Sequence, residues 1–144
     1  MRILLDTSVL VAAMVKAHPA HECALHRLKQ VTHGADDGFV AAHSVAELYA
    51  ILTTLPVLPQ ISPGDALQLI RRNVLNTFEV VCLSDADYAQ VIEHLSTSGI
   101  TGGATYDALI LRAAINANVD QVVTLNEKDF CRVYPALAGK IVSP

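Results

Sequence analysis

The chain has 144 residues, enough for one domain with a substantial core and too few for two ordinary domains. Ten basic and fourteen acidic residues give a net charge of −4, so any contact with a polyanion would need a local basic patch. Hydrophobic residues make up 52% and charged residues 17%, which excludes a disordered chain and indicates that a partner or a second copy covers some apolar surface.

Membrane and secretory classes are not supported. The longest apolar stretch, Val9–Val15, is far below the roughly 18 residues that a membrane-spanning helix needs. Asp6 interrupts the segment that a signal peptide would keep apolar. The three cysteines, which are far apart and form no CxxC pair, are Cys23, Cys82 and Cys131. We therefore expect buried thiols in a reducing cytoplasm rather than disulfides or a zinc site.

The first part of the chain alternates short apolar runs with helical patterns. Strands are predicted at Arg2–Leu5 and Phe39–Ala41, which are too short for helices. Helices are predicted from Asp6 to about Val15, from Pro19 through the core contacts Leu25 and Leu28 to a loop at Thr32–Asp37, and from Ser44 to Leu55.

The second part of the chain continues the alternation. Ser62 and Pro63 form a helix start, and the apolar face of that helix would contain Leu67, Ile70, Val74 and Leu75. Ser84 with Asp87 forms a capping box for a helix to about Ser98. The remaining predictions are strands at Phe78–Leu83, Gln121–Leu125 and Lys140–Val142, a loop at Gly99–Gly103 and a helix at Thr105–Ala117.

This order of elements predicts an α/β fold for residues 1–144 as a single domain. Short apolar strands that alternate with helices form a mostly parallel central sheet flanked by helices on both faces. In such sheets, ligands bind beyond the carboxyl ends of the strands.

Three carboxylates stand alone in otherwise uncharged sequence. Asp6, Glu47 and Asp107 are the only charges in segments of more than ten residues each. A carboxylate removed from water is stable only with hydrogen-bond donors, a cation or a proton shared with another carboxylate. If the three converge, a divalent cation is the best way to cancel their repulsion, and oxygen-only ligands favour Mg²⁺ or Mn²⁺ over zinc.

Each carboxylate also has a purely structural interpretation. Asp6 could cap the helix that follows it, and Ser44 to Glu47 fits a capping box. Asp107 lies in the first predicted turn of its helix, where the helix dipole favours an anion. The two interpretations are compatible, because helix N-termini on one side of a sheet meet at the same edge.

Four segments in order resemble the motifs of PIN-domain ribonucleases. These are Leu4–Leu10, Ser44–Leu48, Gly102–Leu109 and Thr124–Phe130. The order and spacing agree over essentially the whole chain, and the likeness is greatest to VapC-type toxins of bacterial toxin–antitoxin pairs. The fourth segment also admits a simpler interpretation as a solvated turn anchored by Phe130.

The resemblance implies an Mg²⁺- or Mn²⁺-dependent endoribonuclease, cytoplasmic and inhibited by a small cognate antitoxin, and a homodimer. It implies catalytic roles for Asp6, Glu47, Asp107 and Asp129, of which the first three would hold the metal. Thr7, Ser8, Thr124 and Asn126 would be supporting polar residues. Asn126 stands where many members carry an acid, so we expect one bound ion rather than two. A metal held by carboxylates activates water and relieves phosphoryl charge.

Contact with RNA would depend on few cations. Candidates are Arg71, Arg72, Arg112, Lys16 and Lys128, of which Arg112 is the least favoured because it lies off the face of Asp107. His43 is close to Glu47 in sequence, although a surface or capping role is favoured for it.

Other function classes fit less well. A haloacid-dehalogenase-like enzyme needs a second Asp where Ser8 stands, and no GxxxxGK or GxGxxG segment is present. The remaining alternative is a non-catalytic PIN-like module that binds a partner protein through the apolar helices at residues 48–55 and 67–75. Such a module gives no reason for the three isolated acids.

Overall fold

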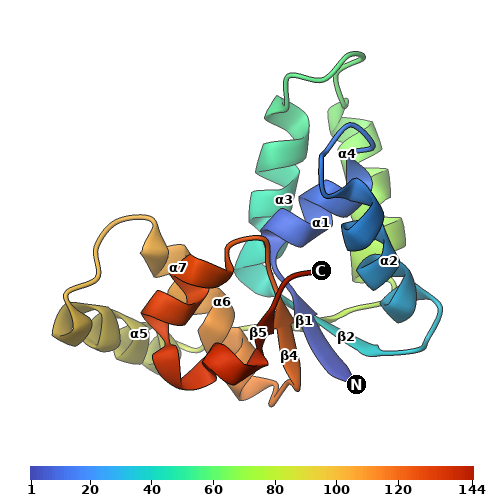
Figure 1. Ribbon diagram of the computed structural model, residues 1–144. Helices are drawn as coiled ribbons and strands as arrows, with labels where there is room; N and C mark the ends of the chain where they lie inside the picture. The colour runs from blue at the N-terminus through green and yellow to red at the C-terminus, as the bar shows by residue number, and fades with distance from the viewer.

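A computed structural model describes all residues 1–144. Its centre is a five-stranded sheet in the order β3-β2-β1-β4-β5, and every neighbouring pair of strands is parallel (Figure 1). The strands are β1 (Arg2–Leu5), β2 (Asp37–Ala41), β3 (Glu79–Val81), β4 (Gln121–Val123) and β5 (Ile141–Val142). The predicted α/β fold with a parallel sheet is confirmed.

Helices cover both faces of this sheet. They are α1 (Thr7–Met14), α2 (His21–Thr32), α3 (Ala42–Thr54), α4 (Pro63–Ile70), α5 (Asp85–Ser98), α6 (Ala104–Asn116) and α7 (Glu127–Val133). A π-helical turn, η1 (Arg71–Leu75), extends α4, and a 3₁₀ segment, η2 (Pro135–Lys140), precedes β5. None of these helices is both long and apolar enough to span a membrane.

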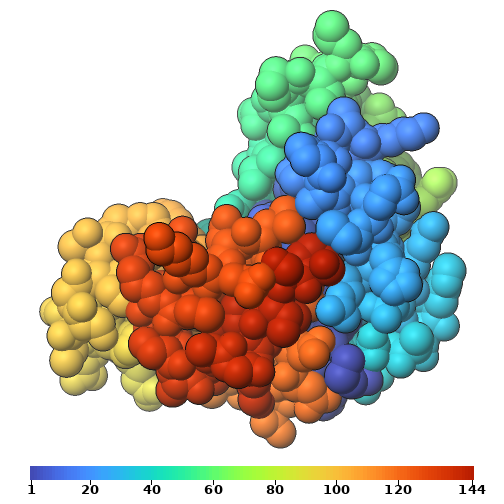
Figure 2. All heavy atoms as spheres, in the orientation of Figure 1, coloured from blue at the N-terminus to red at the C-terminus, as the bar shows by residue number.

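The sheet separates two hydrophobic cores. Ile3 and Leu5 of β1 pack with α1 to α4, whereas Leu4 packs with α5, α6 and α7. Successive side chains of a strand point to opposite faces, so a strand of continuous apolar residues serves both cores. Figure 2 shows the consequence for shape: the region of α3, in green, stands apart from that of α5, in yellow, with a wide notch between them.

Local capping signals predicted two helix starts correctly. The Ser62 side chain accepts a hydrogen bond from the Asp65 amide at the start of α4. Ser84 and Asp87 form the expected reciprocal capping box of α5. Both motifs act within four residues, so they do not depend on tertiary contacts.

Two predictions were wrong in detail. Residues 127–133 form the short helix α7 rather than a solvated turn, because Phe130 and Val133 are fully buried one turn apart. The buried stripe of α4 and η1 is Ala66, Ile70 and Val74, at steps of four residues. Leu67 and Leu75 flank that stripe and are 40% and 44% exposed.

The expected burial of the cysteines was also wrong. Cys23 and Cys82 are exposed, and Cys131 is half-buried. Their spacing along the chain carries no information about which face of an element they occupy.

Candidate active site

Asp6 lies at the carboxyl end of β1, where the chain turns into α1. It is 3% exposed and occupies the N-cap position, but its side chain makes no capping hydrogen bond. Its carboxylate oxygen Oδ2 accepts hydrogen bonds from Ser8 Oγ at 2.6 Å and from Thr124 Oγ1 at 2.8 Å. Capping alone therefore does not account for this side chain, because two hydroxyls from different elements also hold it.

The same hydroxyls fix the loop that follows β4. Ser8 Oγ accepts from the Leu125 amide at 3.1 Å, and Thr124 Oγ1 accepts from the Asn126 amide at 3.0 Å. Burial raises the pKa of Asp6, and the hydrogen bonds from Ser8 and Thr124 oppose that rise. The buried carboxylate is thus oriented, while neither hydroxyl donates to its second oxygen, Oδ1.

Glu47 lies on α3, the helix that follows β2, and β2 is the neighbour of β1 in the sheet. The helix begins at Ala42, so Glu47 lies in its second turn and the predicted capping box with Ser44 does not form. Glu47 Oε2 instead accepts a hydrogen bond from Thr7 Oγ1 at 3.1 Å. His43 Nε2 lies 3.5 Å from the same oxygen. The side chain of His43 therefore reaches the site, contrary to the surface role favoured from the sequence.

Asp107 is in the first turn of α6, as the sequence predicted. Its pKa is raised to about 6, first by burial and then by the negative charges of Asp6, Asp129 and Glu47, whereas Arg132 lowers it. Each of these negative charges disfavours the ionisation of Asp107, so the carboxylates lie close enough to interact, although they come from separate parts of the chain.

The three isolated acids line one cavity. The cavity has a volume of about 280 Å³, and its other lining residues are Thr7, Ser8, Ile51, Gly103, Tyr106, Ile110 and Asn126. No lysine or arginine is among them. Asp129 is outside this lining: it is 57% exposed, and its Oδ1 lies 3.6 Å from Arg132 Nη2. Of the two candidates in the fourth segment, Asn126 therefore contacts the cavity directly.

The donor chemistry of this cavity fits a hard divalent cation. The available charged groups are all carboxylates, and no cation of the chain compensates them within the lining. No group of three acidic, histidine or cysteine side chains is close enough to hold an ion by itself. Mg²⁺ commonly binds through one or two carboxylates and keeps several waters or substrate phosphates, so an incomplete protein cage is compatible with it.

One aromatic side chain of the cavity was missed from the sequence. Tyr106 of α6 stacks on His43 of α3, with ring centroids 5.0 Å apart and planes 1° from parallel. The signal available in the sequence was only an aromatic residue directly before an isolated acid. Which ring it meets depends on how α3 and α6 pack.

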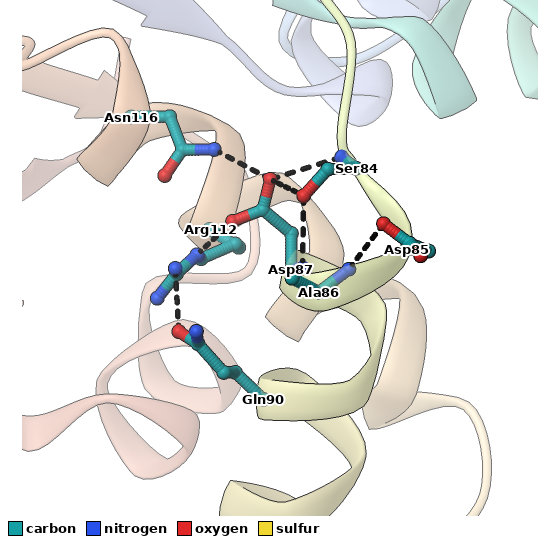
Figure 3. Close-up of polar contacts among 7 residues, drawn as sticks. All are labelled: Ser84, Asp85, Ala86, Asp87, Gln90, Arg112 and Asn116. Atoms are coloured by element: carbon teal, nitrogen blue, oxygen red, sulfur yellow. Dashed lines mark hydrogen bonds and ion pairs between the residues drawn. The ribbon is translucent and has the colours of Figure 1, made fainter.

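The cations proposed for RNA contact divide into two groups. Arg71, Arg72, Lys16 and Lys128 are exposed. Arg112 is not available, because its Nε donates to Asp87 Oδ1 at 2.8 Å and its Nη2 to Gln90 Oε1 at 2.6 Å (Figure 3). It joins α6 to α5 and so has a structural role.

Comparison with known proteins identifies a family model, the PIN domain, that matches residues 3–135. Ribonuclease VapC40 of Mycobacterium tuberculosis is 35% identical over 105 residues, which cover 73% of this chain and 72% of that protein. Ribonuclease VapC27 of the same organism is 31% identical over 116 residues, covering 78% and 76% of the two chains.

Comparison with solved structures finds the same fold in a protein of known structure. A chain in the crystal structure of VapBC2 from Rickettsia felis, bound to a DNA fragment from their promoter, superposes with a TM-score of 0.69. The superposition covers 100% of this chain and 99% of that chain at 21% identity. At that identity, the likeness concerns the fold alone.

Proposed function

The chain belongs to the PIN domain family, and from this premise we propose that it is an endoribonuclease that requires Mg²⁺ or Mn²⁺. The ribonuclease relatives support the reaction class. The observation that carries the metal requirement is the cavity in which Asp6, Glu47 and Asp107 meet without a lysine or arginine. Phosphodiester cleavage needs charge relief on the phosphoryl group, which these carboxylates alone would oppose.

The residues of the acidic cavity would have different roles in this reaction. Asp6 and Asp107 would bind the ion, with Glu47 as the third carboxylate, and the ion would supply water activation and charge stabilisation when bound. Ser8 and Thr124 orient the Asp6 carboxylate through its Oδ2, and Thr7 orients Glu47. Asn126 contacts the cavity rim with a neutral amide, so we propose one resident ion rather than two. Asp129 would act on the site through its charge rather than as a ligand.

We also propose that residues 1–144 act as one toxin domain in the cytoplasm and that a small cognate antitoxin inhibits it. The apolar surplus of the sequence and its similarity to ribonucleases of the VapC type support a partner protein. A homodimer is proposed because large hydrophobic side chains stay exposed, among them Tyr88 at 46% and Ile92 at 55% on α5.

The experiment that tests this function is cleavage of a mixed RNA by the purified protein without a partner. We expect cleavage in Mg²⁺ or Mn²⁺ and none in EDTA. Asp107→Asn should lower the rate about 100-fold or more, because it removes a charged ligand while keeping the size of the side chain. The matched control is Asp85→Asn, the same change at the exposed start of α5, which should leave the rate unchanged.

Two outcomes would contradict the proposal. Cleavage that survives both EDTA and Asp107→Asn would contradict a metal-dependent reaction at these carboxylates. No cleavage by the wild type, together with no Mn²⁺ binding by titration, would favour a non-catalytic module that binds a partner protein.

A further inference from the structure

The stacked pair of Tyr106 and His43 lies beside the acidic cavity: Tyr106 lines it, and His43 adjoins Glu47. The two rings come from α6 and α3, which belong to the two different cores of the molecule. Their planes are 1° from parallel at a centroid separation of 5.0 Å. His43 Nε2 also lies 3.5 Å from Glu47 Oε2, so the stack adjoins one of the three carboxylates.

Tyr106 keeps a large free surface in this arrangement. It is 53% exposed even though His43 covers one face of its ring. The three phenylalanines, by contrast, are at most 6% exposed: Phe39, Phe78 and Phe130. Tyr106 is also the only aromatic residue that lines the acidic cavity. Its ring therefore stacks on His43, keeps a large exposed surface and belongs to the residue directly before Asp107.

We propose that the His43–Tyr106 stack is a platform on which one base of a single-stranded RNA stacks while the adjoining phosphate enters the carboxylate cavity. This inference rests on the proposed ribonuclease function and adds a substrate-binding residue to it. Bases of unpaired RNA stack on tyrosine and histidine rings, and such contacts tolerate different sequences because every base has a π-face.

The charge of the site favours a neutral stacking contact at this position. The cavity lining has no basic residue that could pair with the RNA backbone, and three carboxylates repel it. A ring contact holds a base without a cation, and a tyrosine that already stacks on His43 loses less side-chain entropy on binding than a free side chain does. The few exposed lysines and arginines would then contribute general attraction rather than local positioning.

The test measures the affinity of a fluorescein-labelled, single-stranded RNA of about 12 nucleotides with random sequence. Binding is followed by fluorescence anisotropy with Ca²⁺ in place of Mg²⁺, and the RNA is checked on a gel for cleavage. We expect Tyr106→Ala to raise the Kd roughly tenfold or more, and Tyr106→Phe to keep it within about twofold of wild type. Tyr49→Ala, which removes a comparably exposed ring from α3 outside the cavity lining, should not change it.

The outcomes separate this inference from the proposed function. Equal Kd values for Tyr106→Ala and wild type, or no RNA binding by the wild type, would overturn the platform and leave the exposed ring as a protein contact. An effect of Tyr106→Phe as large as that of Tyr106→Ala would assign the role to the hydroxyl and also overturn it. Ring-dependent binding without any cleavage in Mn²⁺ would support the platform while the ribonuclease proposal fails. Cleavage by the wild type together with an unchanged Kd in Tyr106→Ala would support the ribonuclease proposal and overturn the platform.

Discussion

The ionisation of Asp107 is shifted by its burial and by the carboxylates around it. Its pKa of about 6, against an ordinary value of 3.8, means that the folded protein holds a proton there more tightly than the unfolded chain does. Between pH 3.8 and about pH 6, the free energy of unfolding therefore falls as the pH rises, because the folded state gives up a proton that it binds more tightly. Above about pH 6, the folded state holds an unfavourable negative charge unless a cation offsets it.

This charge gives a prediction for the metal-free protein. Asp107→Asn should be more stable than wild type in EDTA at pH 7.5, by about 1 kcal/mol after allowing for the partial solvent exposure of the group. The difference should shrink as the pH falls from about 6 towards 3, where the wild-type carboxyl is mostly protonated in both states. Urea unfolding at several pH values measures it, and a difference that does not depend on pH would contradict the electrostatic cause.

Ser44 offers a second prediction at the scale of one residue. Its side chain is completely buried in α3, and its hydroxyl oxygen has no hydrogen-bond partner. Ser44→Ala should therefore stabilise the protein by about 1 kcal/mol, since it removes an unsatisfied polar group and favours the helix. Ser84→Ala is the opposite control, because it removes the capping hydroxyl of α5 and should cost about 1 kcal/mol. Thermal unfolding distinguishes the two, and a destabilised Ser44→Ala would show that the hydroxyl is satisfied.

At the scale of elements, α5 and α6 are joined by a polar cluster centred on Asp87. Its carboxylate accepts hydrogen bonds from the Ser84 backbone amide and hydroxyl and from the Arg112 and Asn116 side chains (Figure 3). The bond to the Ser84 backbone, followed by that from Arg112, lowers the pKa of Asp87 to about 2. Asp87 thus caps α5 and also attaches α5 to α6.

Removing the cation of this cluster should loosen the two helices. Arg112→Met keeps the aliphatic stem and loses the bonds to Asp87 and Gln90, so we expect the Tm at pH 7 to fall by roughly 3 °C. Because the pKa of Asp87 is depressed, the benefit of its charge is complete above pH 4 and is lost as the pH falls towards 2. The difference in Tm between variant and wild type should therefore decrease in acid, as differential scanning calorimetry can show. A constant difference would indicate a packing effect instead.

At the scale of the whole molecule, the sheet brings three distant connections to one edge. Asp6 follows β1, Glu47 lies on the helix after β2, and Asp107 begins the helix that precedes β4. Since the strands are parallel, these connections meet at the carboxyl edge, and the repulsion of their acids becomes a property of the folded state. A cation that binds only the folded protein should therefore stabilise it.

The expected effect of the metal follows from this linkage. Mg²⁺ at 100 times its Kd should stabilise the wild type by roughly 2.7 kcal/mol relative to EDTA. Asp6→Asn should abolish this increase, whereas Asp85→Asn should retain it, as measured by Tm with and without Mg²⁺. An equal metal-induced shift in wild type and Asp6→Asn would place the ion elsewhere.

The sequence by itself determined features that depend on neighbours along the chain. The apolar runs of the strands, the caps at Ser62 and Ser84, and the isolation of Asp6, Glu47 and Asp107 are all local patterns, and they sufficed for the parallel α/β fold and for the candidate acids. They sufficed because strand length, capping and uncharged surroundings act within a few residues.

Only the tertiary structure decided how the side chains meet. It placed Asn126 in the cavity lining and turned Asp129 towards Arg132, because α7 begins at Glu127 and is anchored by Phe130. It assigned Arg112 to Asp87 rather than to RNA, and it stacked His43 on Tyr106. The Asp129–Arg132 pair lies within one turn of α7, but the other two contacts join residues far apart in the chain. Their geometry is set by the packing of helices against both faces of the sheet, which no local pattern records.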